Sequence, residues 1–361
     1  MENYVYELAC ALKDDFDVHV LAHSQSNANS DEIWDGFRVR RCATWITALS
    51  QPFSPSLLTE LARLRPDVVN LNAPNALANY AWALAARKSR LVITHHADVL
   101  GRAAAKSAYT PIYRRAVAKA SKVIVFSKKN ARISVDLPPC EDKLVEIPFG
   151  LDPAAWEADA QMRGEAADFR SRLAGRAPVV SFVGRLIGYK GLDVLIEALA
   201  ATPGVHAFVV GDGPLRAALE DSARGAGVAD RFHLLGNLDD RSKQIAMFAS
   251  DAFVLPSISV AEAFGISQVE AQFAGLPVIA TDLPSGVTDV TVDGETGLLV
   301  QPGSAPDLAA ALRRLLGDRE LRARMGAAGR ARAFAKFSRA VFRSSSLAVF
   351  CAVAEAQDLR P

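Results

Sequence analysis

The chain has 361 residues, of which half are hydrophobic and 22% are charged, and its formal net charge is +1. This length suits about two domains, and the balanced charge argues against a disordered chain and against nucleic-acid binding through net charge. No stretch approaches the roughly 18 uninterrupted apolar residues of a membrane span. We expect no signal peptide, because the N-terminal residues form neither a basic n-region nor an apolar h-region.

The four cysteines, at positions 10, 42, 140 and 351, include no Cys-x-x-Cys pair. Their spacing fits neither a metal site nor a disulfide framework. We therefore expect reduced cysteines that form no metal site, in a cytoplasmic protein.

Short apolar runs alternate with helical patterns along the chain. Several runs are rich in Val and Ile and apolar on both faces, which is typical of parallel strands covered by helices on both sides. The expected strands are Val18–Ala22, Val68–Leu71, Leu91–Thr94, Val123–Phe126, Val179–Val183, His206–Val210, His233–Leu235, Ala252–Leu255, Pro277–Ala280 and Gly297–Val300. The expected helices are Tyr4–Lys13, Ser56–Leu64, Asn75–Arg87, Leu192–Ala200, Pro214–Gly225, Ile266–Phe273, Ala305–Leu316 and a long helical tail from Arg319. This alternation predicts an α/β fold with doubly wound sheets.

A break in the pattern divides the chain in two. Two prolines and a glycine interrupt the periodicity at 147–153, and a new series of strands begins after Pro178. We place the boundary within 150–177, with a first domain over 1–150 and a second over 151–337. Residues 338–361 are expected to form a helix that packs back on the first domain.

Residues 99–135 carry many basic residues and no acidic one. One explanation is a solvated helix face. The other is a surface for anionic lipid headgroups, since each basic residue near a bilayer contributes about 1 kcal/mol. Tyr109, Ile112, Tyr113 and Val117 interleave apolar groups that would suit binding at a membrane interface.

The strongest chemical signal follows the expected strand Val179–Val183. The loop Gly184-Arg185-Leu186-Ile187-Gly188-Tyr189-Lys190-Gly191 leads directly into a helix. A helix N-terminus offers free N–H groups to an anion. Arg185 adds a bidentate fork and Lys190 a point charge, and such a pair suits a diphosphate.

A second motif follows the expected strand Ala252–Leu255. Its loop holds Glu262 and then Phe264-Gly265, and Glu270 lies in the helix that comes next. The glycine lets a ligand approach backbone N–H groups closely. The Glu270 carboxylate can accept two hydrogen bonds from a vicinal diol such as that of ribose. Either glutamate alone would indicate a solvated charge, but together with the Arg/Lys loop they favour a nucleotide site.

In the first domain a strand runs into the polar loop Thr94-His95-His96-Ala97-Asp98. The carboxyl ends of strands are where open α/β sheets bind ligands. Two histidines and an aspartate at such an end favour a ligand site over a structural histidine. By contrast, we interpret Asp15-Phe16-Asp17 as a solvated turn.

Three segments, in this order and spacing, resemble the family-4 retaining glycosyltransferases. They are Gly-Arg-Leu-x-x-x-Lys-Gly (184–191), Val-Val-Gly-Asp-Gly-Pro-Leu (209–215) and Glu-x-Phe-Gly-x-x-x-x-Glu (262–270). The match covers 178–316, and Ile147–Asp152 and Gly294–Val300 add weaker similarities. The resemblance implies the GT-B architecture, in which two Rossmann-like domains face each other across a cleft.

The resemblance also implies roles for residues of the second domain. Arg185 and Lys190 would bind the donor diphosphate and stabilise it as the leaving group. Phe264 and Gly265 would offer backbone amides to the distal phosphate and the sugar. Glu262 would contact the donor sugar. No divalent metal is expected, because the cations do its work.

Further roles follow from the same resemblance. Glu270 would hold the ribose, and Leu238 would pack against the nucleobase. His96, with Asp98 beside it, would lie near the donor and acceptor sugars, and Ser127 matches a position in the cleft. Arg185, Lys190, Glu262 and His96 are thus the expected catalytic residues.

The activity so implied is retaining transfer of a hexose, of mannosyl or rhamnosyl type, from a GDP- or UDP-linked donor. The expected acceptor is a polysaccharide, a lipopolysaccharide or a lipid-linked glycan. The basic stretch 99–135 would then touch anionic membrane at the inner face of the cytoplasmic membrane.

The sequence departs from the family at its start. Relatives open with a strand and a paired-glycine loop ahead of the helix matched by Tyr4–Lys13, and Met1-Glu2 resembles the end of that loop. We therefore expect the first sheet to lack its central strand and to expose strand edges. Either the true start lies upstream or this form is impaired.

Three alternatives to a transferase remain to be considered. A nucleotide-sugar epimerase of the same fold would need acid and base carboxylates in the cleft, and the Arg/Lys plus Glu pattern favours a transferase. A dehydrogenase fits less well, because Gly211-Asp212-Gly213-Pro214 lacks the third glycine of the dinucleotide fingerprint. An inactive, N-terminally truncated binding protein is the remaining alternative.

Overall fold

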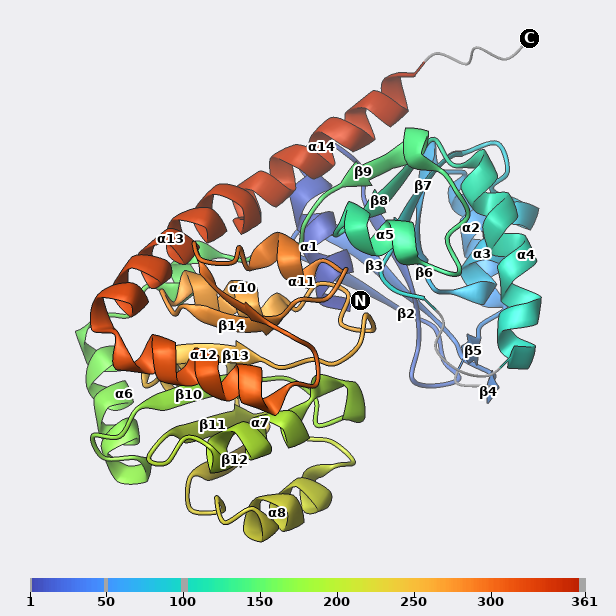
Figure 1. Cartoon of the computed structure of the whole chain (residues 1–361). Helices are drawn as coiled ribbons and strands as arrows, with labels where there is room; N and C mark the ends of the chain where they lie inside the picture. The colour runs from blue at the N-terminus through green and yellow to red at the C-terminus, as the bar shows by residue number, and fades with distance from the viewer. Residues whose placement is uncertain (1, 49–50, 99–102, 357–361) are drawn as a thin grey trace. The chain divides into compact units, whose positions relative to one another are not determined.

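Parallel strands that alternate with helices build both halves of the computed structural model, which describes residues 2–48, 51–98 and 103–356 (Figure 1). The chain divides into two units. Unit 1 comprises Met1–Gly150 and Ala340–Pro361, and unit 2 comprises Leu151–Arg339. The predicted α/β class is confirmed.

Unit 2 is built around one six-stranded parallel sheet with the order β12-β11-β10-β13-β14-β15. Its strands are β10 Val179–Val183, β11 His206–Val210, β12 Phe232–Gly236, β13 Ala252–Leu255, β14 Val278–Thr281 and β15 Gly297–Val300. The chain proceeds from β10 to one side and, after β12, returns to place β13 on the other. The carboxyl ends of β10 and β13 therefore form the topological switch point of this sheet.

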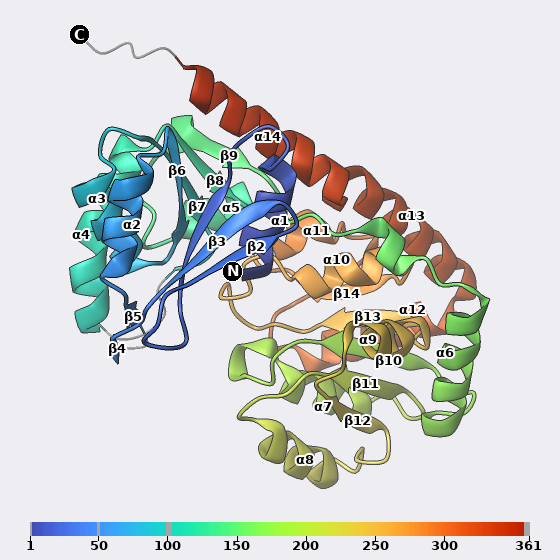
Figure 2. The ribbon, with the colours of Figure 1, turned by 180° about the vertical axis from the view of Figure 1, so that it is seen from behind.

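Helices cover both faces of the unit 2 sheet, and this explains why its strands are apolar on both sides. The helices are α6 Ala160–Leu173, α7 Leu192–Ala200, α8 Arg216–Gly225, α9 Asp240–Phe248, α10 Ile266–Phe273, α11 Val287–Val290, α12 Ala305–Gly317 and α13 Arg319–Phe337, with short turns η2 Pro153–Trp156 and η3 Gly188–Lys190. Helices α7 and α12 pack together in front of the sheet in Figure 1, and α9, which packs against α6, lies in front of it in Figure 2. Phe182, Phe208 and Phe253 are fully buried between the layers, each contributing about 1.5–3 kcal/mol.

Unit 1 contains two larger sheets instead of one. The first has the order β1-β3-β2 and the second β6-β7-β8-β9. The strands are β1 His19–His23, β2 Ser30–Trp34, β3 Phe37–Cys42, β6 Val68–Ala73, β7 Arg90–His95, β8 Lys122–Val125 and β9 Leu144–Glu146, and β4 Ile46–Ala48 pairs with β5 Gln51–Phe53 in a separate hairpin. Within the described residues, β1 pairs with β3 and β6 pairs with β7, and neither has a second partner strand.

The helices of unit 1 are α1 Glu2–Leu12, α2 Ser56–Leu64, α3 Ala76–Ala85, α4 Ala103–Lys119, α5 Lys128–Ile133 and α14 Arg339–Glu355, with the short turn η1 Glu141–Lys143. Strands β2 to β5 and β9 and helices α5, α9 and α11 were not predicted from the sequence, and the region of α4 was interpreted only as a possible helix face. The β2–β3 pair is antiparallel, where we expected only parallel strands. Asp35 and Gly36 between these strands both have positive φ, as a tight two-residue hairpin turn requires.

The C-terminal segment is two helices rather than one continuous helix. Ser338 has an extended backbone and separates α13 from α14. Leu151 N donates to Phe337 O at 2.9 Å, and Arg339 N donates to Leu151 O at 2.7 Å. The two places where the chain passes between the units are thus hydrogen-bonded to each other, and α14 then joins unit 1.

Helix α14 is held in unit 1 by its apolar face. Phe342 is buried and packs edge-on against the ring of Tyr4, with centroids 5.5 Å apart. Arg343 forms an ion pair with Asp14 at 2.5 Å. Among the helices that the structure describes, α14 included, none has the length and apolarity needed to cross a bilayer.

Candidate functional site

Loops from neighbouring strands of unit 2 interlock at the switch point. Leu186 N, after β10, donates to Asp212 O, after β11, at 3.0 Å. Ile258 N, after β13, donates to Tyr189 O in the β10 loop at 2.8 Å. The loop with the predicted Arg/Lys pair is therefore fixed between the two loops beside it.

Two glycines make this close packing possible. A Cβ atom on Gly191 would lie 2.0 Å from Pro256 O, and one on Gly211 would lie 2.0 Å from Gly184 O. Gly191 also has φ +66°, which side-chain-bearing residues rarely adopt. The backbone of the site thus tolerates no side chain at either position.

Lys190 and Glu262 form a buried ion pair that joins the two predicted motifs. Lys190 Nζ lies 2.6 Å from Glu262 Oε2, and the two residues are only 9% and 6% exposed. The hydroxyl of the fully buried Ser257 donates to the same oxygen at 2.8 Å. Both bonds use Oε2, and Oε1 receives no hydrogen bond from a described residue.

Arg185 differs from Lys190 in being exposed. Its guanidinium forms no ion pair with any residue in the part of the chain that the structure describes. A Cβ atom on the nearby Gly188 would meet nothing within 4 Å. The loop therefore carries one cation that is already paired, Lys190, and one that is free to bind a ligand, Arg185.

The segment Phe264-Gly265 begins helix α10. The Phe264 side chain is buried against Phe337, with centroids 5.8 Å apart, so only its backbone could serve a ligand. Gln268 Nε2 donates to Phe264 O at 2.7 Å and holds the turn in place. Gly265 has φ +71° and a Cβ there would clash with Leu255, which explains the glycine.

Glu270, one turn further along α10, faces a lysine that the sequence analysis did not single out. Lys243 Nζ of α9 lies 2.8 Å from Glu270 Oε1. Burial raises the pKa of the Glu270 carboxyl, and Lys243 opposes this shift. Leu238 is half-buried in the loop that leads from β12 into α9.

Unit 2 thus brings six of the predicted residues to one edge of its sheet. They lie in the β10 loop, in the β13 loop and its helix α10: Arg185, Lys190, Glu262, Phe264, Gly265 and Glu270. Leu238 follows β12 at the same edge. Sequence reasoning missed Ser257, Gln268 and Lys243, because a serine, a glutamine and a lysine without special spacing look like ordinary polar residues.

His96 lies in unit 1, just after β7. Its Nε2 is 2.9 Å from Asn72 Oδ1, and the Asn72 amide is oriented by donating from Nδ2 to Asn70. The His96 ring packs edge-on against Tyr4 and Phe126, with centroids 4.9 and 5.3 Å away. Because Oδ1 only accepts, Nε2 carries the proton and Nδ1 keeps a lone pair.

One expectation near His96 needs correction. Asp98 does not lie beside His96: it accepts hydrogen bonds from the Ser134 hydroxyl and from Val135 N, and it faces His95 Nε2 at 3.5 Å. Despite its burial, bonds from His95 and Ser134 hold the pKa of Asp98 below its ordinary value. Ser127 is almost fully buried and caps α5 by accepting from Asn130 N at 3.2 Å.

His96 gives a testable pH dependence. Burial lowers the pKa of His96 to about 3 in the folded protein. In the unfolded chain the same imidazole has a pKa of about 6.5. Between these pH values the unfolded chain therefore binds a proton at His96 and the folded chain does not. The free energy of unfolding should therefore fall with acidification between about pH 6.5 and 3. His96→Gln should lose less stability than the wild type from pH 7 to 4 in urea titrations, and identical acid slopes would contradict this prediction.

The basic stretch 99–135 is only partly described, since residues 99–102 and the side chains of 103–108 lie outside the described residues. Arg114, Arg115 and Lys119 on α4 are exposed. Tyr109 and Tyr113 are buried in the core of unit 1, which contradicts their expected interfacial position. Their spacing of four residues places them on the inner face of the helix.

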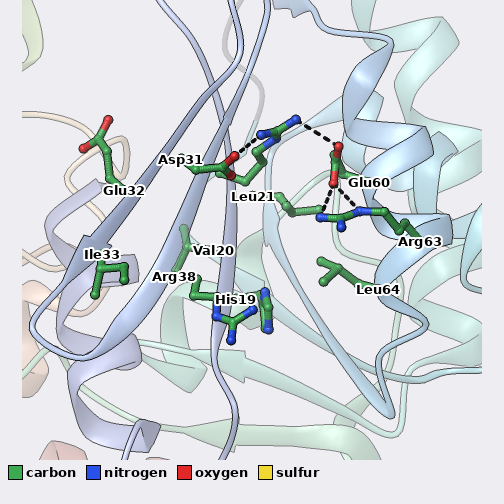
Figure 3. Close-up of a pocket in the computed structure, with 11 residues that line it drawn as sticks. His19, Val20, Leu21, Asp31, Glu32, Ile33, Arg38, Glu60, Arg63 and Leu64 are labelled. Carbon is green, nitrogen blue, oxygen red and sulfur yellow. Dashed lines mark hydrogen bonds and ion pairs between the residues drawn. The ribbon is translucent and has the colours of Figure 1, made fainter.

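A pocket of about 410 Å³ lies in unit 1 between the first sheet and α2 (Figure 3). Arg40 bridges Asp31 and Glu60, and Glu60 also holds Arg63 at 2.9 Å. The pocket also contains Arg38 and Glu32, so its charges largely compensate each other. It contains none of the residues of the predicted motifs.

Comparisons with known proteins identify the family of the chain. Residues 165–332 match the family model "Glycosyl transferases group 1", and residues 1–155 match "Glycosyltransferase Family 4". The chain is 30% identical over 299 residues to D-rhamnosyltransferase WbpZ of Pseudomonas aeruginosa, covering 82% of this chain and 77% of that protein. It is 26% identical over 336 residues to O-antigen chain mannosyltransferase C of Escherichia coli, covering 92% and 88%.

A solved structure with a similar fold is that of Anabaena Alr3699/HepE in complex with UDP and glucose. The TM-score is 0.79 at 22% identity, and the match covers 97% of this chain and 95% of that one. The match covers nearly the whole chain, so both units have the fold of that protein.

Proposed function

The chain belongs to glycosyltransferase family 4 and has the GT-B fold, and from this membership we propose that it transfers a hexose from a nucleoside-diphosphate sugar to a glycan with retention of configuration. The observation that carries the proposal is the pairing of Lys190 with Glu262 at the switch point of the unit 2 sheet. Open α/β sheets bind their ligands at this position.

In this mechanism Lys190 and Arg185 bind the donor diphosphate and neutralise it as it leaves. Groups already held in place stabilise developing charge without reorganisation, and this is usually the largest single contribution to catalysis. Glu262 and the tight loop hold Lys190 in place before the donor binds. Arg185 is exposed and turns to the diphosphate when the donor binds. Glu262 uses its remaining oxygen for a donor-sugar hydroxyl, and the departing phosphate accepts the proton of the incoming hydroxyl.

Other residues bind the rest of the donor. The backbone of Phe264 and Gly265 contacts the distal phosphate and sugar, Glu270 the ribose, and Leu238 the nucleobase. His96, neutral and with a lone pair on Nδ1, contacts the reacting sugars. We propose that the two cations of the β10 loop serve in place of a divalent metal.

For the substrates, we propose a GDP- or UDP-linked donor of mannosyl type and a polysaccharide, lipopolysaccharide or lipid-linked acceptor. The similarity to a D-rhamnosyltransferase and to an O-antigen chain mannosyltransferase supports this choice. We also propose a cytoplasmic enzyme at the inner face of the membrane. Support comes from four free cysteines and from the exposed cations Arg114, Arg115 and Lys119.

A donor screen tests the proposal. UDP-, GDP- and dTDP-sugars are added to the purified protein, and a ligand that binds the folded state raises Tm. At 100 times Kd the stabilisation is about 2.7 kcal/mol. The stabilising sugar is then supplied in labelled form with candidate acceptors. Stabilisation by no nucleotide sugar would contradict the proposal, and binding without transfer would favour an inactive binding protein.

A further inference from the structure

Lys243 is held on several sides at the predicted ribose position. Its amine lies 2.8 Å from Glu270 Oε1 and 3.0 Å from Asp240 Oδ1, and 5.9 Å from the ring centre of the buried Trp156. The side chains of Lys243 and Glu270 are only 18% and 14% exposed. This is a fixed, largely desolvated pair and not a mobile surface contact.

The pair matters because Glu270 is a carboxylate in a buried setting. Burial disfavours its charged form, and a neutral carboxyl group has one hydroxyl that donates and fewer free acceptors. Lys243 counteracts this effect: although burial lowers its own pKa, the carboxylates of Glu270 and Asp240 raise that pKa above its ordinary value. Trp156 adds cation–π attraction from a third element, η2.

The two carboxylate oxygens of Glu270 have different surroundings. Lys243 binds Oε1, and Oε2 receives no hydrogen bond from any described residue. A ribose diol donates two hydrogen bonds, and an ionised carboxylate accepts them more strongly than a neutral carboxyl group. Resting on the proposed function, we infer that Lys243 is a positioning residue that keeps Glu270 ionised and oriented, and thereby makes donor binding depend on the ribose hydroxyls.

The test compares ligands that differ only in these hydroxyls. UDP, GDP and their 2′,3′-dideoxy analogues are titrated calorimetrically into the wild type and into Lys243→Met, Lys243→Arg and Arg241→Met. Arg241 is the matched control, since it lies on the same helix and pairs with Glu165 at 2.8 Å. Circular dichroism checks that each variant is folded.

We expect the wild type to prefer the ribonucleotide over its dideoxy analogue by roughly tenfold or more, as charged hydrogen bonds predict. Lys243→Met should bind the ribonucleotide roughly tenfold more weakly and the dideoxy analogue unchanged. Lys243→Arg, which retains the charge, should recover most of the preference, and Arg241→Met should behave as wild type.

Two results would overturn the inference. One is a preference for the ribonucleotide that persists in folded Lys243→Met. The other is an equal loss of affinity for both ligands, which would mean that Lys243 contacts another part of the nucleotide or only supports the fold. Failure of the proposed function looks different, because the wild type itself would then bind neither UDP nor GDP.

Discussion

Lys190→Ala is expected to lower the rate of sugar transfer by about 100-fold to 1,000-fold, the usual effect of removing one well-placed electrostatic group. The reason is twofold. The donor diphosphate loses the cation that the tight β10 loop holds in place, and Glu262 Oε2 keeps only the hydrogen bond from Ser257. Steady-state kinetics with the stabilising donor, on protein shown to be folded, measures the effect.

The same substitution should also cost stability, because it leaves a buried carboxylate without its partner, at about 3–5 kcal/mol. The double variant Lys190→Met with Glu262→Gln separates the two effects. It removes both charges, so it should regain most of the free energy of unfolding while remaining inactive. Wild-type turnover in a folded Lys190→Ala protein would exclude Lys190 from the mechanism.

Gly191→Ala should be strongly destabilising although it adds only a single methyl group to the site. The new Cβ would lie 2.0 Å from Pro256 O, and the residue would retain φ +66°. Because the obstacle is backbone of the β13 loop, one of the two motif loops must move. We expect a loss of several kcal/mol in urea unfolding, well above the roughly 1–2 kcal/mol cost of the left-handed conformation alone, and loss of nucleotide binding.

Gly227→Ala is its matched control. Gly227 has φ +69°, nearly the same backbone conformation, but its Cβ would meet nothing within 4 Å. Gly227→Ala should therefore lose only the free energy of unfolding that the left-handed backbone costs, about 1–2 kcal/mol. It should bind nucleotides like the wild type. If both variants lost the same free energy of unfolding, the clash with Pro256 O would not be the cause of the loss.

The fold of unit 2 could be read from the sequence because its strands are buried on both faces. Val179–Val183 and His206–Val210 begin and end where the apolar runs predicted. Unit 1 was harder to predict. Strand β3 carries three arginines in six residues, so no apolar run marks it, although the Asp35-Gly36 pair before it was a usable turn signal.

The site shows a similar division. Arg185, Lys190 and Glu262 could be named in advance, because the glycines around them fix short loops after strands. Contacts between residues of separate elements could not be predicted from the sequence. The bond from Lys243 on α9 to Glu270 on α10 spans 27 residues, and the inward direction of Asp98 depends on Ser134, 36 residues away. Such pairs have no signature within one sequence window.

Helix α14 sets the order in which the protein can be completed during synthesis. Unit 2 is one continuous piece of chain, so it can fold as soon as Arg339 has left the ribosome. Unit 1 is encoded in two pieces, and its Tyr4 cluster waits for Phe342 to arrive. Unit 1, whose first segment is synthesised first, therefore completes its fold last. Until α14 is made, unit 1 exposes the apolar surface that Phe342 and Phe350 later cover.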